Sequence, residues 1–268
     1  MELWWVYLLI GAVIGFMSGL LGIGGGMVLV PIMLYVFGLQ GPEAGFPPDH
    51  LMHMSLATAM ATIPFTTASS VRAHHTRGGI AWDIVRGMLP GLALGALLAT
   101  VVAGKVPGRP LAIFFAAFIF YAATSMFFDL KPKGTRALPG WLGLGFTGTV
   151  ISFLSTFLAA GAAFLTIPFM AWCNVPLKRA VGTAAAIGFP LGLIASVGYI
   201  YAGLQAGPLP RHSLGFIYLP ALAMIVAPSM LTAPLGASLS HRMPVKQLRM
   251  VFAFTLYVIA VRMIISLW

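Results

Sequence analysis

Serine, threonine and glycine residues that could bind a small anion recur at matching places in the two halves of this chain. A helix that begins just after a glycine break points unpaired backbone N–H groups and the positive end of its dipole at the break, and nearby hydroxyls add further donors. The alternative is that these small residues only let helices pack closely, with each hydroxyl bonded to its own helix backbone. The candidate ligand-binding residues are Ser18, Gly24, Gly25, Gly26, Thr58, Thr62, Ser155, Thr156, Gly161, Thr183 and Ser196.

The segments that must position these residues are written twice in the sequence. An offset of 137 positions aligns residues 4–33 with a second stretch and gives ten identities in thirty positions. Composition alone would give roughly two or three. The aligned pairs include Gly11 with Gly148, Ser18 with Ser155, Gly24 with Gly161 and Pro31 with Pro168, and with small gaps Thr58 with Thr183. Because many carriers build a midplane site from inverted repeats of interrupted helices, this pattern favours transport.

Composition places the chain in lipid. Of its 268 residues, 60% are hydrophobic and 7% are charged, in successive apolar runs of about membrane-spanning length. A soluble fold is therefore excluded as the main interpretation. The net charge of +10 comes from cations in short loops between apolar runs, which form no continuous basic face, so we expect a lipid bilayer and no nucleic acid as partner.

The predicted fold is all-α and polytopic, with two inverted repeats of about five hydrophobic segments each. The first repeat covers residues 1–130, a cytoplasmic linker covers 131–139 and the second repeat covers 140–268, within one membrane domain. The second segment of each repeat is short: residues 162–173 give only about 18 Å of helix, so it is either tilted or re-entrant. The segments are 3–21, 25–39, 51–71, 84–103, 110–130, 140–158, 162–173, 179–203, 214–232 and 246–268.

Basic residues predict the orientation in the membrane. With the linker in the cytoplasm, both termini lie outside, and eleven Lys and Arg residues lie inside against three outside. The outer three are Lys105, Arg109 and Arg211. The inner eleven are Arg72, Arg77, Arg86, Lys131, Lys133, Arg136, Lys178, Arg179, Arg242, Lys246 and Arg249.

Few other side chains suggest chemistry. The five acidic residues fall near predicted interfaces, and no paired carboxylates, nucleophile elbow or His-x-x-x-His pair is present, so we expect no enzyme, metal or cofactor. His50 and His53 leave proton coupling open. Arg262 lies within the last apolar segment, where snorkelling to the outer surface is favoured over a place in a cavity.

The chain resembles the TauE/SafE family of sulfite and organosulfonate exporters. The motif is Gly-Phe-Met-Ser-Gly-Leu-Leu-Gly-Ile-Gly-Gly-Gly at 15–26, followed by Pro31 and by Ala-Thr-Ala at 57–59. A degenerate second copy runs through Pro168 to Gly-Thr-Ala at 182–184, so the resemblance covers essentially the whole chain. The second copy has Ala-Gly-Ala-Ala at 160–163 where the first has Ile-Gly-Gly-Gly, so the two breaks need not bind ligand equally.

The resemblance implies a multi-pass permease of the bacterial inner membrane that exports a small sulfur-containing anion. Sulfite, sulfoacetate and thiosulfate are examples of such an anion. An anion channel for the same substrates is the first alternative, and a membrane partner that relays sulfur through Cys173 is another. The sequence does not specify which anion is carried, in which direction it moves or which ion is coupled to it. It also leaves the oligomeric state open, and a homo-oligomer is among the states that it allows.

Overall fold

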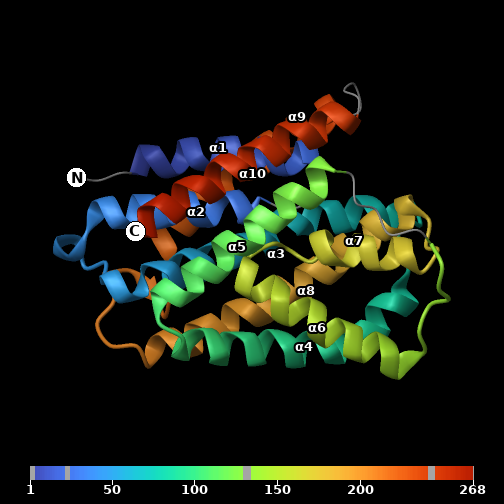
Figure 1. The fold of residues 1–268 in the computed structure, drawn as a ribbon, viewed down its shortest axis with the longest axis horizontal. Coiled ribbons are helices and arrows are strands. Elements are labelled where there is room, and N and C mark those ends of the chain that lie inside the picture. The colour runs from blue at the N-terminus through green and yellow to red at the C-terminus, as the bar shows by residue number, and fades with distance from the viewer. Residues whose placement is uncertain (1–3, 22–24, 129–133, 241–244, 268) are drawn as a thin grey trace.

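Helices make up most of the chain in the computed structural model, which describes residues 4–21, 25–128, 134–240 and 245–267 (Figure 1). The predicted all-α fold is confirmed. The described helices are α1 (Trp4–Leu21), α2 (Gly26–Gln40), α3 (Leu51–Thr76), α4 (Trp82–Lys105), α5 (Gly108–Phe127), α6 (Trp141–Leu158), α7 (Ala163–Trp172), α8 (Leu177–Leu204), α9 (Leu219–Ser240) and α10 (Val245–Leu267), with short 3-10 turns η1 (Pro42–Ala44) and η2 (Pro48–His50).

Five of the described helices are long and apolar enough to cross a membrane. They are α4, α5, α6, α8 and the part of α9 from Leu219 to Gly236. Shorter apolar helices occur at Trp4–Ser18, Gly26–Gln40, Ala163–Trp172 and Met250–Ile265. The chain is therefore a multi-pass membrane protein, as predicted.

The second helix of each half is separated from the first by a break. Helix α1 ends at Leu21 and α2 begins at Gly26, while α6 ends at Leu158 and α7 begins at Ala163. At the second break the backbone enters the left-handed region at Ala159, with φ of 42°, and at Gly161, with φ of 61°. Because a non-glycine residue in this region is strained by about 1–2 kcal/mol, the turn at Ala159 is held by its surroundings.

The two halves begin at opposite ends of the molecule in Figure 1. Helix α1 starts at the end where both termini are marked, and α6 starts at the other end. Helices α2 and α7 each turn back toward the end from which the preceding helix came. An inverted repeat requires its two halves to begin at opposite ends of the molecule in this way. The inverted relationship itself remains a prediction.

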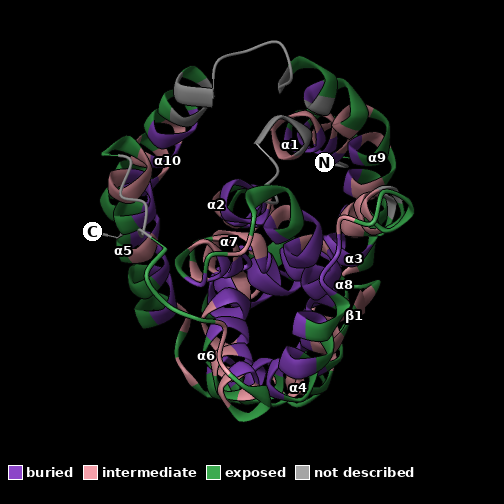
Figure 2. Ribbon diagram, turned by 90° about the vertical axis from the view of Figure 1, so that its right-hand side faces the viewer, coloured by how far each residue is buried: buried purple, intermediate pink, exposed green. Residues whose placement is uncertain are grey.

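Helix packing pairs α1 with α9, α6 with α4, α3 with α8 and α5 with α10. If each helix is replaced by its counterpart in the other half, the α1–α9 pair becomes the α6–α4 pair. The α3–α8 and α5–α10 pairs are unchanged by the same replacement. Figure 2 shows α2 and α7 in the middle, between the α5–α10 pair and the α1–α9 pair. Close approach depends on glycine: a Cβ on Gly148 would lie 2.6 Å from the carbonyl oxygen of Met88, and the Cβ of Gly11 would meet the backbone of Ile225.

One predicted segment begins later than expected. The apolar run predicted from residue 214 starts as a two-stranded hairpin, with β1 (Ser213–Leu214) antiparallel to β2 (Ile217–Tyr218), and α9 begins only at Leu219. Gly215, with φ of 55°, makes the turn between the two strands. Hydropathy alone does not separate an apolar hairpin from the first turn of an apolar helix.

Candidate functional site

The two helix breaks meet inside the protein. Gly26, the first residue of α2, is buried, and a Cβ built on it would overlap the carbonyl oxygen of Ala159, the residue that caps α6. A Cβ on the neighbouring Gly25 would overlap the side chain of Ile14 in α1. Glycine therefore lets α2 begin against the end of α6 at position 26 and against α1 at position 25.

Three hydroxyl groups flank the second break and have no hydrogen-bond partner. Ser155 and Thr156 lie in the last turn of α6, and Thr166 lies in the first turn of α7. All three side chains are fully buried, and each hydroxyl oxygen is unpaired in the structure. An unsatisfied buried hydroxyl costs about 1–3 kcal/mol, so three beside one break make this region the candidate site for a polar ligand.

Backbone groups at the breaks add further donors. In α7 Thr166 N–H donates to the carbonyl of Ala162 at 2.9 Å, and in α2 the N–H groups of Val28 (3.2 Å) and Leu29 (2.9 Å) both donate to the carbonyl of Gly25. Helix geometry leaves the N–H groups before Thr166 and before Val28 without an acceptor inside their helix. The two helix starts thus bring donors and positive dipole ends to the region where the breaks meet, which suits an anion.

The second break is braced by α8. The hydroxyl of Tyr199, which is fully buried, donates to the backbone carbonyl of Thr156 at 3.1 Å. Ala160 N–H donates to the carbonyl of Ser155 at 3.2 Å. These bonds occupy the carbonyls at the end of α6 and leave the two hydroxyls of that turn available.

The remaining predicted site residues have other positions. Ser18 is half-buried in the last turn of α1, Gly161 is buried within the second break, and Gly24 lies outside the described residues. The hydroxyls of Thr62 and Ser196 donate to carbonyls of their own helices, at Ala59 (2.7 Å) and Gly192 (2.6 Å). For Thr62 and Ser196 the structure thus has the self-bonded arrangement expected of a packing residue.

Thr58 and Thr183 make matching structural bonds. Thr183 Oγ1 accepts a hydrogen bond from Ala81 N–H at 2.9 Å, and Ala81 is the residue just before α4. Thr58 Oγ1 accepts one from Tyr218 N–H at 3.1 Å, and Tyr218 is the residue just before α9. Each threonine of the third helix in a half therefore fixes the start of the fourth helix in the other half.

His53 is a capping residue for α4. Its Nε2 lies 2.9 Å from the carbonyl oxygen of Ala103 and 3.0 Å from that of Val106, so Nε2–H donates to the end of that helix. The ring stacks on Phe216, with centroids 5.2 Å apart, and lies 5.5 Å from the ring of His50. The Nδ1 atoms of both histidines are buried without a partner, so coupling through them stays an open prediction.

Cys173 lies next to the linker between the halves. Backbone N–H groups of Thr135 and Arg136 donate to the carbonyl of Trp172, and the guanidinium carbon of Arg136 lies 4.5 Å from the centre of the Trp172 ring. Burial raises the pKa of the Cys173 thiol, although the charge of Arg136 opposes the shift. A raised pKa leaves less of the reactive thiolate at neutral pH.

Two residues of this region were missed by the sequence reasoning. Thr166 has no counterpart in the first half, where the aligned residue is Leu29, so the repeat gave no signal for it. Its place three residues after Ala163, within the first turn of a short helix, was the only clue. Tyr199 could not be linked to the break from sequence, because 43 positions separate it from Thr156. The described residues contain no group of three or more His, Cys, Asp or Glu side chains that could hold a metal ion.

Comparison with known proteins agrees with this architecture. Residues 5–263 match the family described as "Sulfite exporter TauE/SafE". The chain belongs to the TauE/SafE family. Among the relatives of this TauE/SafE protein, a "Probable membrane transporter protein" of Haemophilus influenzae is 34% identical over 264 residues, which cover 97% of each chain.

More distant relatives carry the same kind of description. A probable membrane transporter protein of Methanocaldococcus jannaschii is 23% identical over 96% of this chain and 94% of its own length. One of Bacillus subtilis is 25% identical over 88% of this chain and 90% of its own. No solved structure matches the chain. The TauE/SafE protein described here is therefore a membrane transporter.

Proposed function

We propose that this protein exports a small sulfur-containing oxyanion, such as sulfite or an organosulfonate, across the bacterial inner membrane. The observation that carries the proposal is the set of three buried, unpartnered hydroxyls of Ser155, Thr156 and Thr166 beside the second break. The family name supports sulfite as the type of substrate. An oxyanion accepts hydrogen bonds from several directions at once, and several unpaired hydroxyls and backbone N–H groups beside one break offer such donors.

In this proposal the ligand is held at the meeting point of the breaks. The starts of α2 and α7 contribute backbone N–H groups and dipole ends, and the hydroxyls of Ser155, Thr156 and Thr166 contribute directional donors. Ser18, Gly25 and Gly161 complete the surroundings. Because none of these donors carries a full charge, the anion is held loosely enough to leave, as a carrier requires.

Transport then follows from an inverted pair of repeats, 1–130 and 140–268, that rock about the bound anion. The end that holds the α3–α4 turn, the linker and the start of α8 is cytoplasmic, and the end that holds both termini is outside. An anion leaving a negative interior gains about 2.3 kcal/mol per charge per 100 mV. Export therefore runs downhill without a coupling ion.

The test of the proposed site is uptake of labelled sulfite in proteoliposomes. We expect Ser155→Ala, Thr156→Val and Thr166→Val each to lower the flux about tenfold, since each removes one hydrogen bond to a charged ligand. Thr62→Val and Ser196→Ala are matched controls, because those hydroxyls bond their own helices. Equal flux in all five variants would remove the hydroxyls from the site.

An anion channel is the alternative mechanism for the same substrate class. An exchange measurement separates the two mechanisms. The binding site of a carrier can return across the membrane with a second anion bound, and this speeds the exchange of anions. We expect labelled sulfite inside the vesicles to leave faster when unlabelled sulfite is present outside. A flux that neither saturates nor responds to sulfite on the opposite side would identify a channel.

A further inference from the structure

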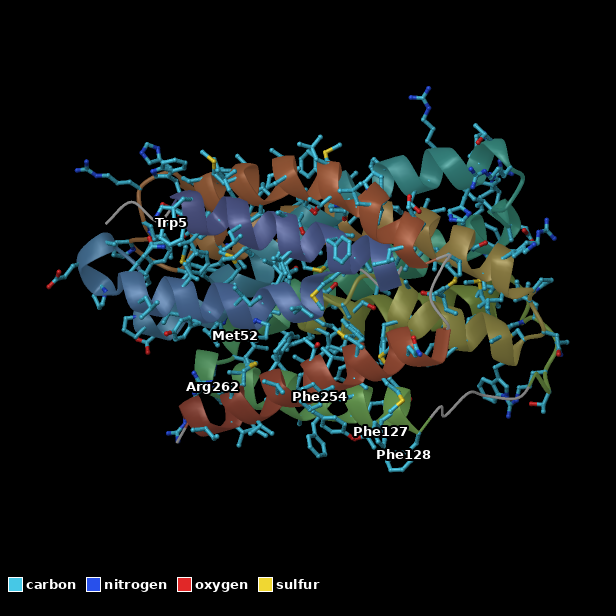
Figure 3. All side chains as sticks on the ribbon, turned by 90° about the horizontal axis from the view of Figure 1, so that it is seen from above. Trp5, Met52, Phe127, Phe128, Phe254 and Arg262 are labelled. Carbon is cyan, nitrogen blue, oxygen red and sulfur yellow. The ribbon has the colours of Figure 1, made fainter. Side chains whose placement is uncertain are left out.

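A groove opens at the end of the molecule where both termini lie. It has a volume of about 780 Å³ and runs between α2, the start of α3, the start of α5 and the end of α10. Its walls are mainly apolar and include Ile32 and Tyr35 of α2 and Val258 and Ile259 of α10. Figure 3 shows Met52 of α3 and Arg262 of α10 near each other at this end.

Two cations line the groove. Arg109 lies at the start of α5 and Arg262 near the end of α10, and both are exposed. None of the described residues that line the groove is acidic. A concave apolar passage whose described wall carries a cation such as Arg262 and no acidic side chain attracts anions, because field lines concentrate between low-dielectric walls.

The groove points toward the proposed site. Pro31 forms part of its wall and lies five residues after Gly26, a separation of about 7.5 Å along a helix. Helix α2 lies in the middle of the molecule in Figure 2 and not at its periphery. A ligand that follows α2 inward from Leu39 therefore travels toward the meeting point of the breaks.

We propose that this groove is the outer vestibule of the transporter, and that Arg262 selects for anions within it. The inference rests on the proposed function and names the route by which the anion leaves. Arg262 thereby takes the cavity role that the sequence reasoning held second to snorkelling. The occupant is a small, water-borne sulfonate or sulfite anion and not a lipid acyl chain.

The experiment measures the access of charged reagents to a cysteine in the groove. Ile32→Cys is introduced into Cys173→Ala protein in nanodiscs of uncharged phosphatidylcholine. Reaction rates are then compared for two methanethiosulfonates, one bearing a sulfonate and one bearing a trimethylammonium group. We expect the sulfonate reagent to react faster, and Arg262→Gln to lower the ratio of the two rates roughly five-fold.

The controls use the same end of the molecule. Arg211→Gln removes an arginine that does not line the groove and should leave the ratio unchanged. Ala44→Cys, an exposed position outside the groove, should show no effect of Arg262. Salt at 1 M, where the screening length is about 3 Å, should weaken the preference in protein with both arginines.

Two results would overturn the vestibule. If the cysteine at position 32 reacts with neither reagent, the groove is filled by lipid or closed to water. If the ratio is the same with and without Arg262, the arginine does not select. Because labelling uses no carried substrate, a charge preference found together with absent sulfite flux would reject the proposed cargo and keep the vestibule. Sulfite flux without the preference would reject the vestibule alone.

Discussion

Gly26 at the start of α2 lies directly against the carbonyl oxygen of Ala159 at the end of α6. The two residues come from different breaks and are 133 positions apart in the sequence. Their contact packs the start of one interrupted helix against the end of the other. This contact gives a physical reason for glycine at position 26 that is independent of any ligand.

Gly26→Ala should destabilise the protein. The added Cβ would overlap the Ala159 carbonyl oxygen, and overpacking of this kind costs about 1–3 kcal/mol. Gly38→Ala in the same helix is the matched control, because the nearest atom to its Cβ is Leu51 Cδ1 at 4.0 Å. Thermal unfolding in detergent should show a lower Tm for the first variant and an unchanged or higher Tm for the second. Equal Tm values would contradict the contact.

Thr58→Val and Thr183→Val should lower stability to a similar extent. Each removes the acceptor of a backbone N–H, at Tyr218 and Ala81, and an unsatisfied N–H costs about 1–3 kcal/mol. Thr62→Val should cost less, since the Ala59 carbonyl keeps its place in the helix. Chemical unfolding measures the differences. Sulfite flux per folded molecule should be unchanged in the first two variants. A large loss of flux without a loss of stability would instead show that Thr58 and Thr183 belong to the anion site.

His53→Gln should retain sulfite flux and its dependence on pH. The glutamine amide can replace Nε2–H as donor to the carbonyls of Ala103 and Val106, but it cannot titrate. His53→Ala should instead lower Tm, because the end of α4 loses its cap. If His53→Gln abolishes flux or removes a pH dependence, proton coupling through this histidine is established.

Alkylation of Cys173 should be slow at neutral pH and should accelerate as pH rises past the ordinary thiol value of 9.0. Burial raises its pKa, so the reactive thiolate forms only at higher pH. Arg136→Gln removes the charge that opposes this shift and should slow the reaction further. Cys173→Ala should keep full flux. A fast reaction at pH 7 together with loss of transport in Cys173→Ala would favour the sulfur relay.

The repeat predicted the position of the breaks because both copies retain glycine there. Gly24, Pro31 and their partners Gly161 and Pro168 indicated short second helices in both halves, and the structure has α2 and α7 at these places. The contact between Gly26 and Ala159 could not be predicted from the sequence, since the atoms that meet there depend on the tertiary arrangement of both halves. Apolar length likewise did not reveal the hairpin before α9.

The same repeat was ambiguous about the site. Recurrence marks any position that both halves need, whether for binding or for folding. Thr58 and Thr183 recur because each fixes the start of a helix, while Ser155 has an unpaired hydroxyl and its partner Ser18 is only half-buried. Thr166, which occurs in one half alone, could not be found by comparing the halves.

Equilibrium binding to purified protein in nanodiscs tests the anion site most directly. The ligands are sulfite, sulfate, thiosulfate, sulfoacetate and the zwitterion taurine, each measured with the native protein and with the triple variant Ser155→Ala, Thr156→Val, Thr166→Val. We predict that at least one sulfur oxyanion binds the native protein, and that the triple variant, folded with a similar Tm, binds it at least tenfold more weakly. Unchanged affinity in the folded triple variant would contradict a site at the helix breaks.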